Sequence, residues 1–247
     1  MRAYSGRTAV ITGGGSGVGF ATARTLVDGG ARVVITGRSR ATLDAARERL
    51  GANAVAVRGD VASLTDLDTL ADRVESELGT VDALFVNAGV AALTPLATTT
   101  EEAYDELFAI NVKGAWFTVQ KLAPLLNPGA GVVLTTSVAN AVGIPDTSVY
   151  AAGKAALRSM ARSFSRELLP RGIRVNAISP GPVDTGALDA TMTAEEAARF
   201  KAERVADNPM RRFGTPEEIA RAAAFLAFEA TYTTGAELVA DGGATQL

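Results

Sequence analysis

Tyr150 and Lys154 are the side chains in this sequence best placed for proton transfer. The chain has no histidine and no cysteine, which excludes thiolate nucleophiles, Cys/His zinc sites and Ser-His-Asp mechanisms. A tyrosine with the ordinary pKa of about 10 is a weak acid near neutral pH. Because the two residues are four apart, they lie on one face of a helix, where the ammonium group should lower the pKa of Tyr150. The pair is therefore a candidate general acid and base.

A glycine-rich turn over residues 12–19 is suited to phosphate binding. It reads Thr-Gly-Gly-Gly-Ser-Gly-Val-Gly and directly follows a short apolar run. Glycines remove the Cβ atoms that would block close approach of the backbone, and a helix N-terminus behind them offers free N–H groups to a pyrophosphate. The spacing fits neither Gly-x-Gly-x-x-Gly nor a Walker A loop. It fits the variant Thr-Gly-x-x-x-Gly-x-Gly.

Seven short apolar runs, separated by segments of helical length, predict the elements that position these groups. The runs are nearly continuous in apolarity, as expected of parallel strands buried on both faces. They cover residues 9–11, 33–35, 55–57, 84–86, 132–134, 175–178 and 238–239. Ser63 with Asp66, and Thr215 followed by Pro216, mark helix starts.

This alternation predicts a single α/β domain over residues 1–247, without a linker. We expect a doubly wound, Rossmann-type parallel sheet of about seven strands with helices on both faces. A (β/α)8 barrel is the competing architecture at this length. The glycine-rich turn after the first strand favours the open sheet.

Composition and charge exclude several kinds of partner. Of the 247 residues, 47% are hydrophobic and 21% are charged, so a buried core is expected. A net charge of −3 without a basic block argues against nucleic acid as a partner. Prolines and glycines interrupt residues 122–145, the longest uncharged span, which argues against a membrane helix. No metal site is expected, and the predicted location is the cytoplasm.

Further motifs follow the glycine-rich turn in a regular order. They are Asn87-Ala88-Gly89, Asn111, Ser137, Tyr150-x-x-x-Lys154 and Pro180-Gly181-Pro182-Val183-Asp184-Thr185. In order and spacing, from Thr12 to Gly243, the chain resembles the short-chain dehydrogenase/reductase family and especially its 3-oxoacyl-carrier-protein reductase-like branch. The resemblance implies an NAD(P)-dependent oxidoreductase that transfers a hydride between the cofactor and a small-molecule ketone or secondary alcohol.

The resemblance also assigns roles to individual residues. Tyr150 would be the general acid in reduction and the base in oxidation, and Lys154 would also bind the nicotinamide ribose. Ser137 would polarise the substrate oxygen, and Asn111 would position a water molecule in the proton relay. Asp60 would accept a hydrogen bond from the adenine amino group, unless it only stabilises a helix N-terminus. Cofactor contacts are expected from Gly13, Ser16, Gly17, Val18, Gly19, Arg38, Ser39, Asp60, Val61, Asn87, Ala88, Gly89, Tyr150, Lys154, Pro180, Gly181, Val183 and Thr185.

The end of the second strand indicates which nicotinamide cofactor is used. An NAD enzyme usually places a carboxylate there, against the ribose 2′-hydroxyl, whereas this sequence reads Gly-Arg-Ser-Arg over residues 37–40. Arg38 is suited to charge-assisted hydrogen bonds with a 2′-phosphate. We therefore expect NADP. NAD stays the alternative, because Ser16 stands where NADP-preferring relatives often have a basic residue. Arg38 and Arg40 could also be solvated side chains at a helix start.

The family resemblance also bears on assembly and substrate. Small residues begin the helix predicted over residues 148–169, so another backbone could approach it closely, and the family implies a homotetramer. The substrate is expected to meet residues 181–210 and 138–145. Neither segment identifies it.

Two alternative functions remain open. A 3-oxoacyl-carrier-protein reductase would need a basic docking surface, for which Arg171 and Arg174 are candidates, although residues 127–131, interpreted as a loop, carry no charge. A dinucleotide-sensing regulator could use the same fold without catalysis. The intact Ser137, Tyr150 and Lys154 argue against this second alternative.

Overall fold

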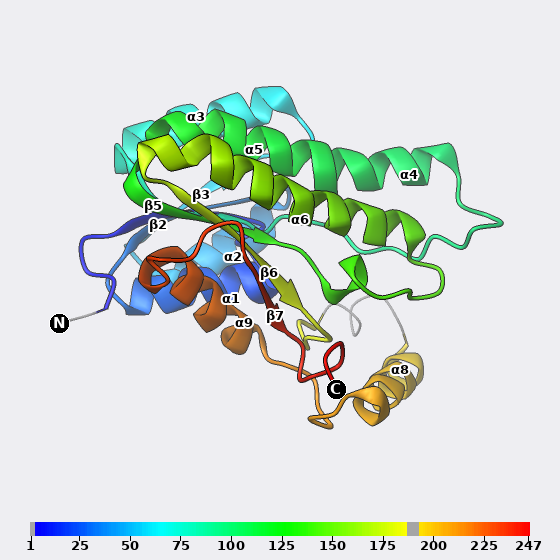
Figure 1. The fold of residues 1–247 in the computed structure, drawn as a ribbon. Helices are drawn as coiled ribbons and strands as arrows, with labels where there is room; N and C mark the ends of the chain where they lie inside the picture. The colour runs from blue at the N-terminus through cyan, green and yellow to red at the C-terminus, as the bar shows by residue number, and fades with distance from the viewer. Residues whose placement is uncertain (1–2, 187–192) are drawn as a thin grey trace.

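Seven parallel strands form one open sheet in the computed structural model, which describes residues 3–186 and 193–247 (Figure 1). Their order across the sheet is β3-β2-β1-β4-β5-β6-β7. The strands are β1 (Thr8–Thr12), β2 (Arg32–Gly37), β3 (Ala54–Arg58), β4 (Val81–Val86), β5 (Leu126–Thr135), β6 (Arg174–Pro180) and β7 (Glu237–Ala240). All seven strand predictions are confirmed, and the open sheet excludes the barrel. The extent of the domain stays a prediction.

Helices cover both faces of the sheet (Figure 1). One face carries α1 (Gly17–Asp28), α2 (Arg40–Leu50) and α9 (Pro216–Ala224). The other carries α3 (Leu64–Leu78), α4 (Glu101–Phe108), α5 (Ala115–Leu122) and α6 (Ser148–Leu168). A further helix, α8 (Ala194–Asp207), lies apart from both layers. Within the described residues, no helix is both long and apolar enough to cross a membrane.

Two hydrophobic cores hold these layers together, because successive side chains of a strand point to opposite faces. Val10 of β1 belongs to the core beneath α3, α5 and α6, whereas its neighbour Ile11 belongs to the core against α1, α2 and α9. Both residues have 0% exposure. Burial on both faces explains why the strands read as continuous apolar runs.

The strand order places a crevice at the carboxyl ends of β1 and β4. β1 pairs with β2 on one side and with β4 on the other. From β1 the chain first adds β2 and β3 on one side of the sheet, and then adds β4 and the later strands on the other side. Ligands of such sheets bind where the strand order reverses in this way, here between β1 and β4. Apart from Asn111, the residues predicted to carry chemistry follow strand ends or lie near helix starts at this edge.

Local predictions are mostly confirmed. Ser63 and Thr215 are the N-caps of α3 and α9, and Thr215 forms a full capping box with Glu218. Helix α6 ends at Leu168, one residue before the predicted end. The predicted loop at residues 127–131 is wrong, because β5 runs through it with a shift in register against β4.

Candidate active site

The glycine-rich turn is packed too tightly for side chains. Gly13 and Gly17 have φ angles of +66° and +51°, which favour glycine. A Cβ atom on Gly19 would lie 2.2 Å from the Gly13 carbonyl oxygen. Ser16 precedes α1 without capping it through its side chain, and the first turn of α1 has no acidic residue. The turn is therefore a narrow backbone cradle in front of an uncapped, positive helix end.

Asn87 and Thr12 fix this turn against β4. The Thr12 hydroxyl oxygen accepts hydrogen bonds from the backbone N–H groups of Asn87 and Ala88, both at 3.0 Å. Asn87 Nδ2 donates to the Thr12 carbonyl at 3.2 Å, and the Thr135 hydroxyl donates to Asn87 Oδ1 at 3.3 Å. One asparagine thus joins the ends of β1, β4 and β5.

A cleft of about 580 Å³ opens beside the turn and brings most of the predicted site residues together. Its walls come from the starts of α1 and α6 and from the ends of β4, β5 and β6. The predicted residues among its lining are Ser16, Gly17, Val18, Gly89, Ser137, Tyr150, Lys154, Pro180, Gly181, Val183 and Thr185. Gly13, Gly19, Asn87 and Ala88 form the packed turn beside it. Of the expected substrate segment, residues 187–192 lie outside the described residues.

Ser137, Tyr150 and Lys154 lie close together in this cleft. The Ser137 hydroxyl is hydrogen-bonded to the Tyr150 phenol. Lys154 Nζ lies 5.6 Å from the centroid of the Tyr150 ring and donates to the Thr135 carbonyl at 2.9 Å. Lys154 is only 5% exposed. The structure therefore places two hydroxyls and one ammonium group at the end of β5.

The expected lowering of the Tyr150 pKa is wrong for the chain by itself. Burial raises the pKa of Tyr150 above its ordinary value, and the hydrogen bond with Ser137 only partly opposes this. Burial also lowers the pKa of Lys154 from 10.5 to about 8. Desolvation disfavours both charged forms, and it outweighs the attraction that the four-residue spacing suggested.

Asn111 is buried, and both polar atoms of its side-chain amide are hydrogen-bonded to Val90. It lies in a π-helical segment, η1 (Ala109–Gly114), between α4 and α5. Its Oδ1 accepts from the Val90 N–H and its Nδ2 donates to the Val90 carbonyl, both at 2.8 Å. π-helical turns often mark functional positions. Asn111 therefore holds the segment that follows β4 against η1, and its role in a proton relay stays a prediction.

A second hollow, of about 510 Å³, lies at the ends of β2 and β3 and contains two of the residues predicted for the adenosine side. Arg38 and Asp60 line it, together with Arg58, which sequence reasoning missed. Arg58 pairs with Gly37 across the two strands, and its Nε donates to the Arg38 carbonyl at 3.1 Å. Its position at the end of β3 was the signal that could have found it.

Two other residues predicted for the adenosine side have structural contacts. Ser39 caps α2, because its side chain accepts from the Thr42 N–H. Val61 is buried, and a Cβ atom on Gly114 would lie 2.9 Å from it. Val61 therefore packs against η1 and is not among the residues that line the hollow.

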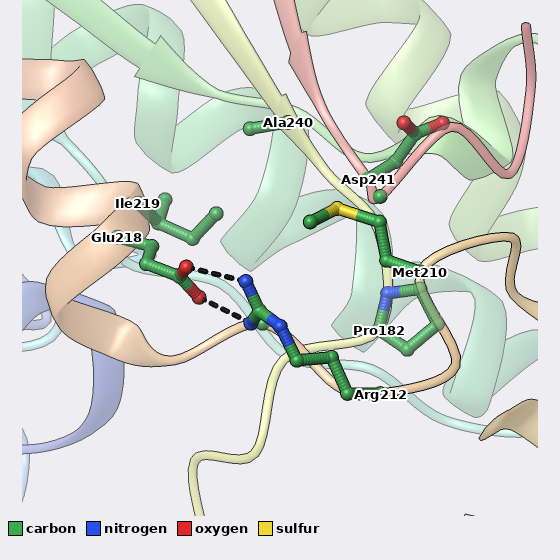
Figure 2. A pocket seen from close by; sticks show the side chains of 9 residues that line it. Pro182, Met210, Arg212, Glu218, Ile219, Ala240 and Asp241 are labelled. Atoms are coloured by element: carbon green, nitrogen blue, oxygen red, sulfur yellow. Dashed lines mark hydrogen bonds and ion pairs between the residues drawn. The ribbon is translucent and has the colours of Figure 1, made fainter.

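The turn over residues 180–185 is held from its outer side by the segment that leads into α9. Gly214 N–H donates to the Pro182 carbonyl at 2.9 Å, and Asp184 N–H donates to the Gly214 carbonyl at 3.0 Å. Figure 2 shows the small cavity of about 190 Å³ beside this turn, with Arg212 in a two-pronged ion pair with Glu218. Hydrogen bonding to Arg212 lowers the pKa of Glu218 to about 2. The cavity lies against the turn, and none of the reactive side chains lines it.

Comparison with known proteins identifies the family. Residues 13–245 match the family described as Enoyl-(Acyl carrier protein) reductase. The chain is 42% identical over 250 residues to Oxidoreductase asL5 from Sarocladium schorii, and the alignment covers 100% of this chain and 99% of that protein. It is 33% identical over 244 residues to 2-(S)-hydroxypropyl-CoM dehydrogenase 3 from Xanthobacter autotrophicus, covering 96% of each.

A solved structure agrees with these sequence matches. It is described as the short-chain dehydrogenase/reductase SDR:Glucose/ribitol dehydrogenase from Brucella melitensis, with a TM-score of 0.92, 31% identity and 99% of each chain covered. The sheet order, the glycine cradle and the grouping of Ser137, Tyr150 and Lys154 thus occur on a fold shared over nearly the whole chain. The chain belongs to the short-chain dehydrogenase/reductase family and is an NAD(P)-dependent oxidoreductase.

Proposed function

We propose that this enzyme transfers a hydride between NADP(H) and a ketone or secondary alcohol, with Tyr150 as general acid and base. The observation that carries the proposal is the single cleft in which the Ser137–Tyr150 hydrogen bond and Lys154 adjoin the glycine cradle. A raised Tyr150 pKa keeps the phenol protonated near neutral pH. That is the form required to donate a proton to a carbonyl oxygen.

The residues present fit a nicotinamide dinucleotide. The cradle leaves no room for Cβ atoms at Gly13 and Gly19, and the φ of +51° at Gly17 favours glycine. The α1 N-terminus behind the cradle suits the pyrophosphate. Lys154, with one of its three donors on the Thr135 carbonyl, would hold the nicotinamide ribose. When bound, the cofactor supplies or accepts the hydride.

The protein's own part of the reaction follows from three side chains. Ser137 would hold the substrate oxygen by a hydrogen bond, and Tyr150 would donate its phenolic proton to that oxygen as the carbonyl is reduced. The Lys154 ammonium lies close enough to the ring to stabilise the phenolate that remains. In oxidation the same proton moves in the opposite direction, from the alcohol to the phenolate.

Two guanidinium groups support NADP rather than NAD. Arg38 and Arg58 both line the adenosine-side hollow, and within the described residues neither forms an ion pair with a carboxylate. The carboxylates in the hollow are otherwise engaged: Asp60 accepts from the Ala62 N–H at 2.9 Å, and Asp66 accepts from the Asp60 N–H at 2.8 Å. A 2′-phosphate would find two unpaired cations there.

The proposal is tested by following NADPH and NADH consumption with a panel of ketones, sugars, steroids and acyl thioesters. We expect turnover of at least one ketone, faster with NADPH, and its loss in Tyr150→Phe while NADPH binding is retained. Tyr232→Phe, at a fully exposed position, is the matched control. Binding of NADPH without turnover of any compound would instead support the dinucleotide-sensing regulator.

The structure weakens one argument for a carrier-protein substrate. Arg174, a candidate for the docking surface, is only 8% exposed and donates to the Leu226 and Ala230 carbonyls at 2.8 and 3.0 Å. Arg171 remains at the surface, although its guanidinium donates to the Ala123 and Leu126 carbonyls. A faster reaction with the carrier-protein thioester than with the same thioester of a small thiol would restore this alternative.

We also propose a homotetramer. An apolar surface groove of about 520 Å³ between η1, α5 and α6 is lined by Phe108, Val112, Trp116, Phe117 and Met160, and the exposed part of this face would be covered by a second copy. Trp116 is the only tryptophan, so Trp116→Glu should abolish both the interface and its fluorescence signal, and light scattering would report the change in mass.

The cytoplasmic location stays a prediction, which cell fractionation would test.

A further inference from the structure

A polar cluster lies behind the cleft, where β7, β6, α6 and the short helix η3 (Val138–Asn140) meet. Glu237 on β7 is at its centre. Its Oε1 accepts hydrogen bonds from Asn140 Nδ2 at 2.7 Å and from the Ser179 hydroxyl, and its Oε2 accepts from Arg158 Nε at 2.8 Å. The side chains of Glu237 and Arg158 are 20% and 14% exposed, and Ser179 is buried. We call these four residues the Glu237 cluster.

The donors around Glu237 keep its carboxylate charged. Partial burial by itself would raise the pKa of Glu237, but the hydrogen bonds from Ser179, Asn140 and Arg158 outweigh that effect and leave the pKa lowered. A carboxylate removed from water is stable only with such partners. Each partner is therefore held in a defined direction, because losing one would leave charge without compensation.

The cluster holds the segment that carries Ser137. Asn140 Nδ2 donates to the Ser137 carbonyl at 2.6 Å as well as to Glu237. On the other side of Ser137, the Thr136 N–H donates to the Ile178 carbonyl at 2.8 Å, and the Thr136 hydroxyl donates to the Ser179 hydroxyl, which in turn donates to Glu237. Hydrogen bonds thus hold the chain at Thr136, before Ser137, and at Asn140, after it. Both sets of hydrogen bonds connect to the Glu237 carboxylate.

The cluster also holds the helix that carries Tyr150. Arg158 follows Tyr150 by eight residues and Lys154 by four, so the three side chains lie along one face of α6. The ion pair with Glu237 and a bond from Arg158 to the Gly235 carbonyl at 3.1 Å tie this face to β7. Ser137 and Tyr150 come from two different elements, and Glu237 is joined to both.

We propose that Glu237 is a positioning residue, which aligns the Ser137 and Tyr150 hydroxyls by holding η3 and α6 against β7. Glu237 is not itself a lining residue of the cleft and so acts through Asn140 and Arg158. The inference rests on the proposed function for its meaning, since that function makes these two hydroxyls the reacting pair.

The alignment can be measured without any substrate. The protein has four tyrosines, so carbon-13 labelling of the tyrosine Cζ atoms gives four signals, and Tyr150→Phe assigns the one of interest. We expect this signal to move in Glu237→Gln and in Asn140→Ala in the same direction as in Ser137→Ala. Glu77→Gln, which breaks the exposed Arg73 ion pair on α3, is the control and should leave it in place.

Kinetics give the second readout. Glu237→Gln should lower kcat about tenfold while KM for the cofactor stays within about twofold, and it should cause no further loss in a Ser137→Ala background. Losses that multiply, or a Tyr150 signal that stays in place in both cluster variants, would overturn the inference. If Glu237→Gln does not fold, Asn140→Ala decides, because it leaves the Arg158 ion pair intact. If no ketone is reduced, the proposed function fails while the Tyr150 signal still decides the alignment.

Discussion

Replacing the buried Lys154 with methionine should make the protein more stable at neutral pH. Burial lowers the pKa of Lys154 from 10.5 to about 8, which means that the folded state binds the lysine proton less tightly than the unfolded state does. At about 1.4 kcal/mol for each pKa unit, the charged ammonium destabilises the fold by about 3 kcal/mol below pH 8. Methionine leaves the Thr135 carbonyl without its donor, which costs about 1 kcal/mol. The expected net gain is about 2 kcal/mol.

The sign of this effect should reverse with pH. Below about pH 8 the lysine is charged in both states and the whole penalty is present. Between pH 8 and 10.5 the unfolded state binds more protons, so the wild-type protein gains stability as the pH rises. Above that range the lysine is neutral in both states, and only the lost hydrogen bond distinguishes the variant. Lys154→Met should then be the less stable protein by about 1 kcal/mol.

Urea unfolding followed by Trp116 fluorescence, at pH 7 and at about pH 11.5, measures both differences. Other groups titrate alike in the two proteins, so they cancel in the comparison. Arg47→Met, at an exposed position on α2, controls for the loss of a positive charge. A Lys154→Met protein that is less stable at pH 7, by the same amount at both pH values, would refute the reasoning.

Two further substitutions test the cofactor site. Arg38→Ala should lower kcat/KM for NADPH by about ten- to a hundredfold, the value of a charged hydrogen bond, and leave the NADH constants nearly unchanged. Equal losses with both cofactors would mean that Arg38 is structural. Arg40→Ala, which breaks an exposed ion pair with Asp44, is the control. Gly19→Ala should raise the NADPH dissociation constant at least about tenfold, because its Cβ would lie 2.2 Å from the Gly13 carbonyl oxygen. Gly143→Ala, where a Cβ meets nothing within 4 Å, is the comparison, and equal affinities in the two glycine variants would contradict a tight cradle.

The fold was predictable because local and global signals agree along this chain. Each strand is buried on both faces, so its sequence is a continuous apolar run, and helix starts such as Ser63 and Thr215 carry their own capping residues. Agreement between local pattern and tertiary packing is what makes a fold readable from sequence. The loop assigned to residues 127–131 failed because proline and glycine there accommodate a register shift inside β5.

Most residues of the candidate site were predictable from the sequence, but their pKa values were not. The spacing of Tyr150 and Lys154 correctly predicted one helix face, but the pKa values depend on burial, which the spacing does not contain. Arg174 was misjudged for the same reason, since a cation that donates to backbone carbonyls inside the fold reads like a surface arginine in sequence. Glu237 lies 97 residues from Asn140 in the chain, and no local pattern connects them.

The partners of the buried charges separate structural from reactive groups. Arg174 has several backbone carbonyl acceptors and Glu237 has three donors, so each is matched by the protein itself. Lys154 has three N–H donors, and among the described residues the Thr135 carbonyl is its one hydrogen-bond acceptor. A buried ammonium with unmatched donors is unfavourable in the isolated chain, and it lines the cleft where a ribose would supply acceptors. The predicted instability and the proposed binding role of Lys154 therefore have one physical origin.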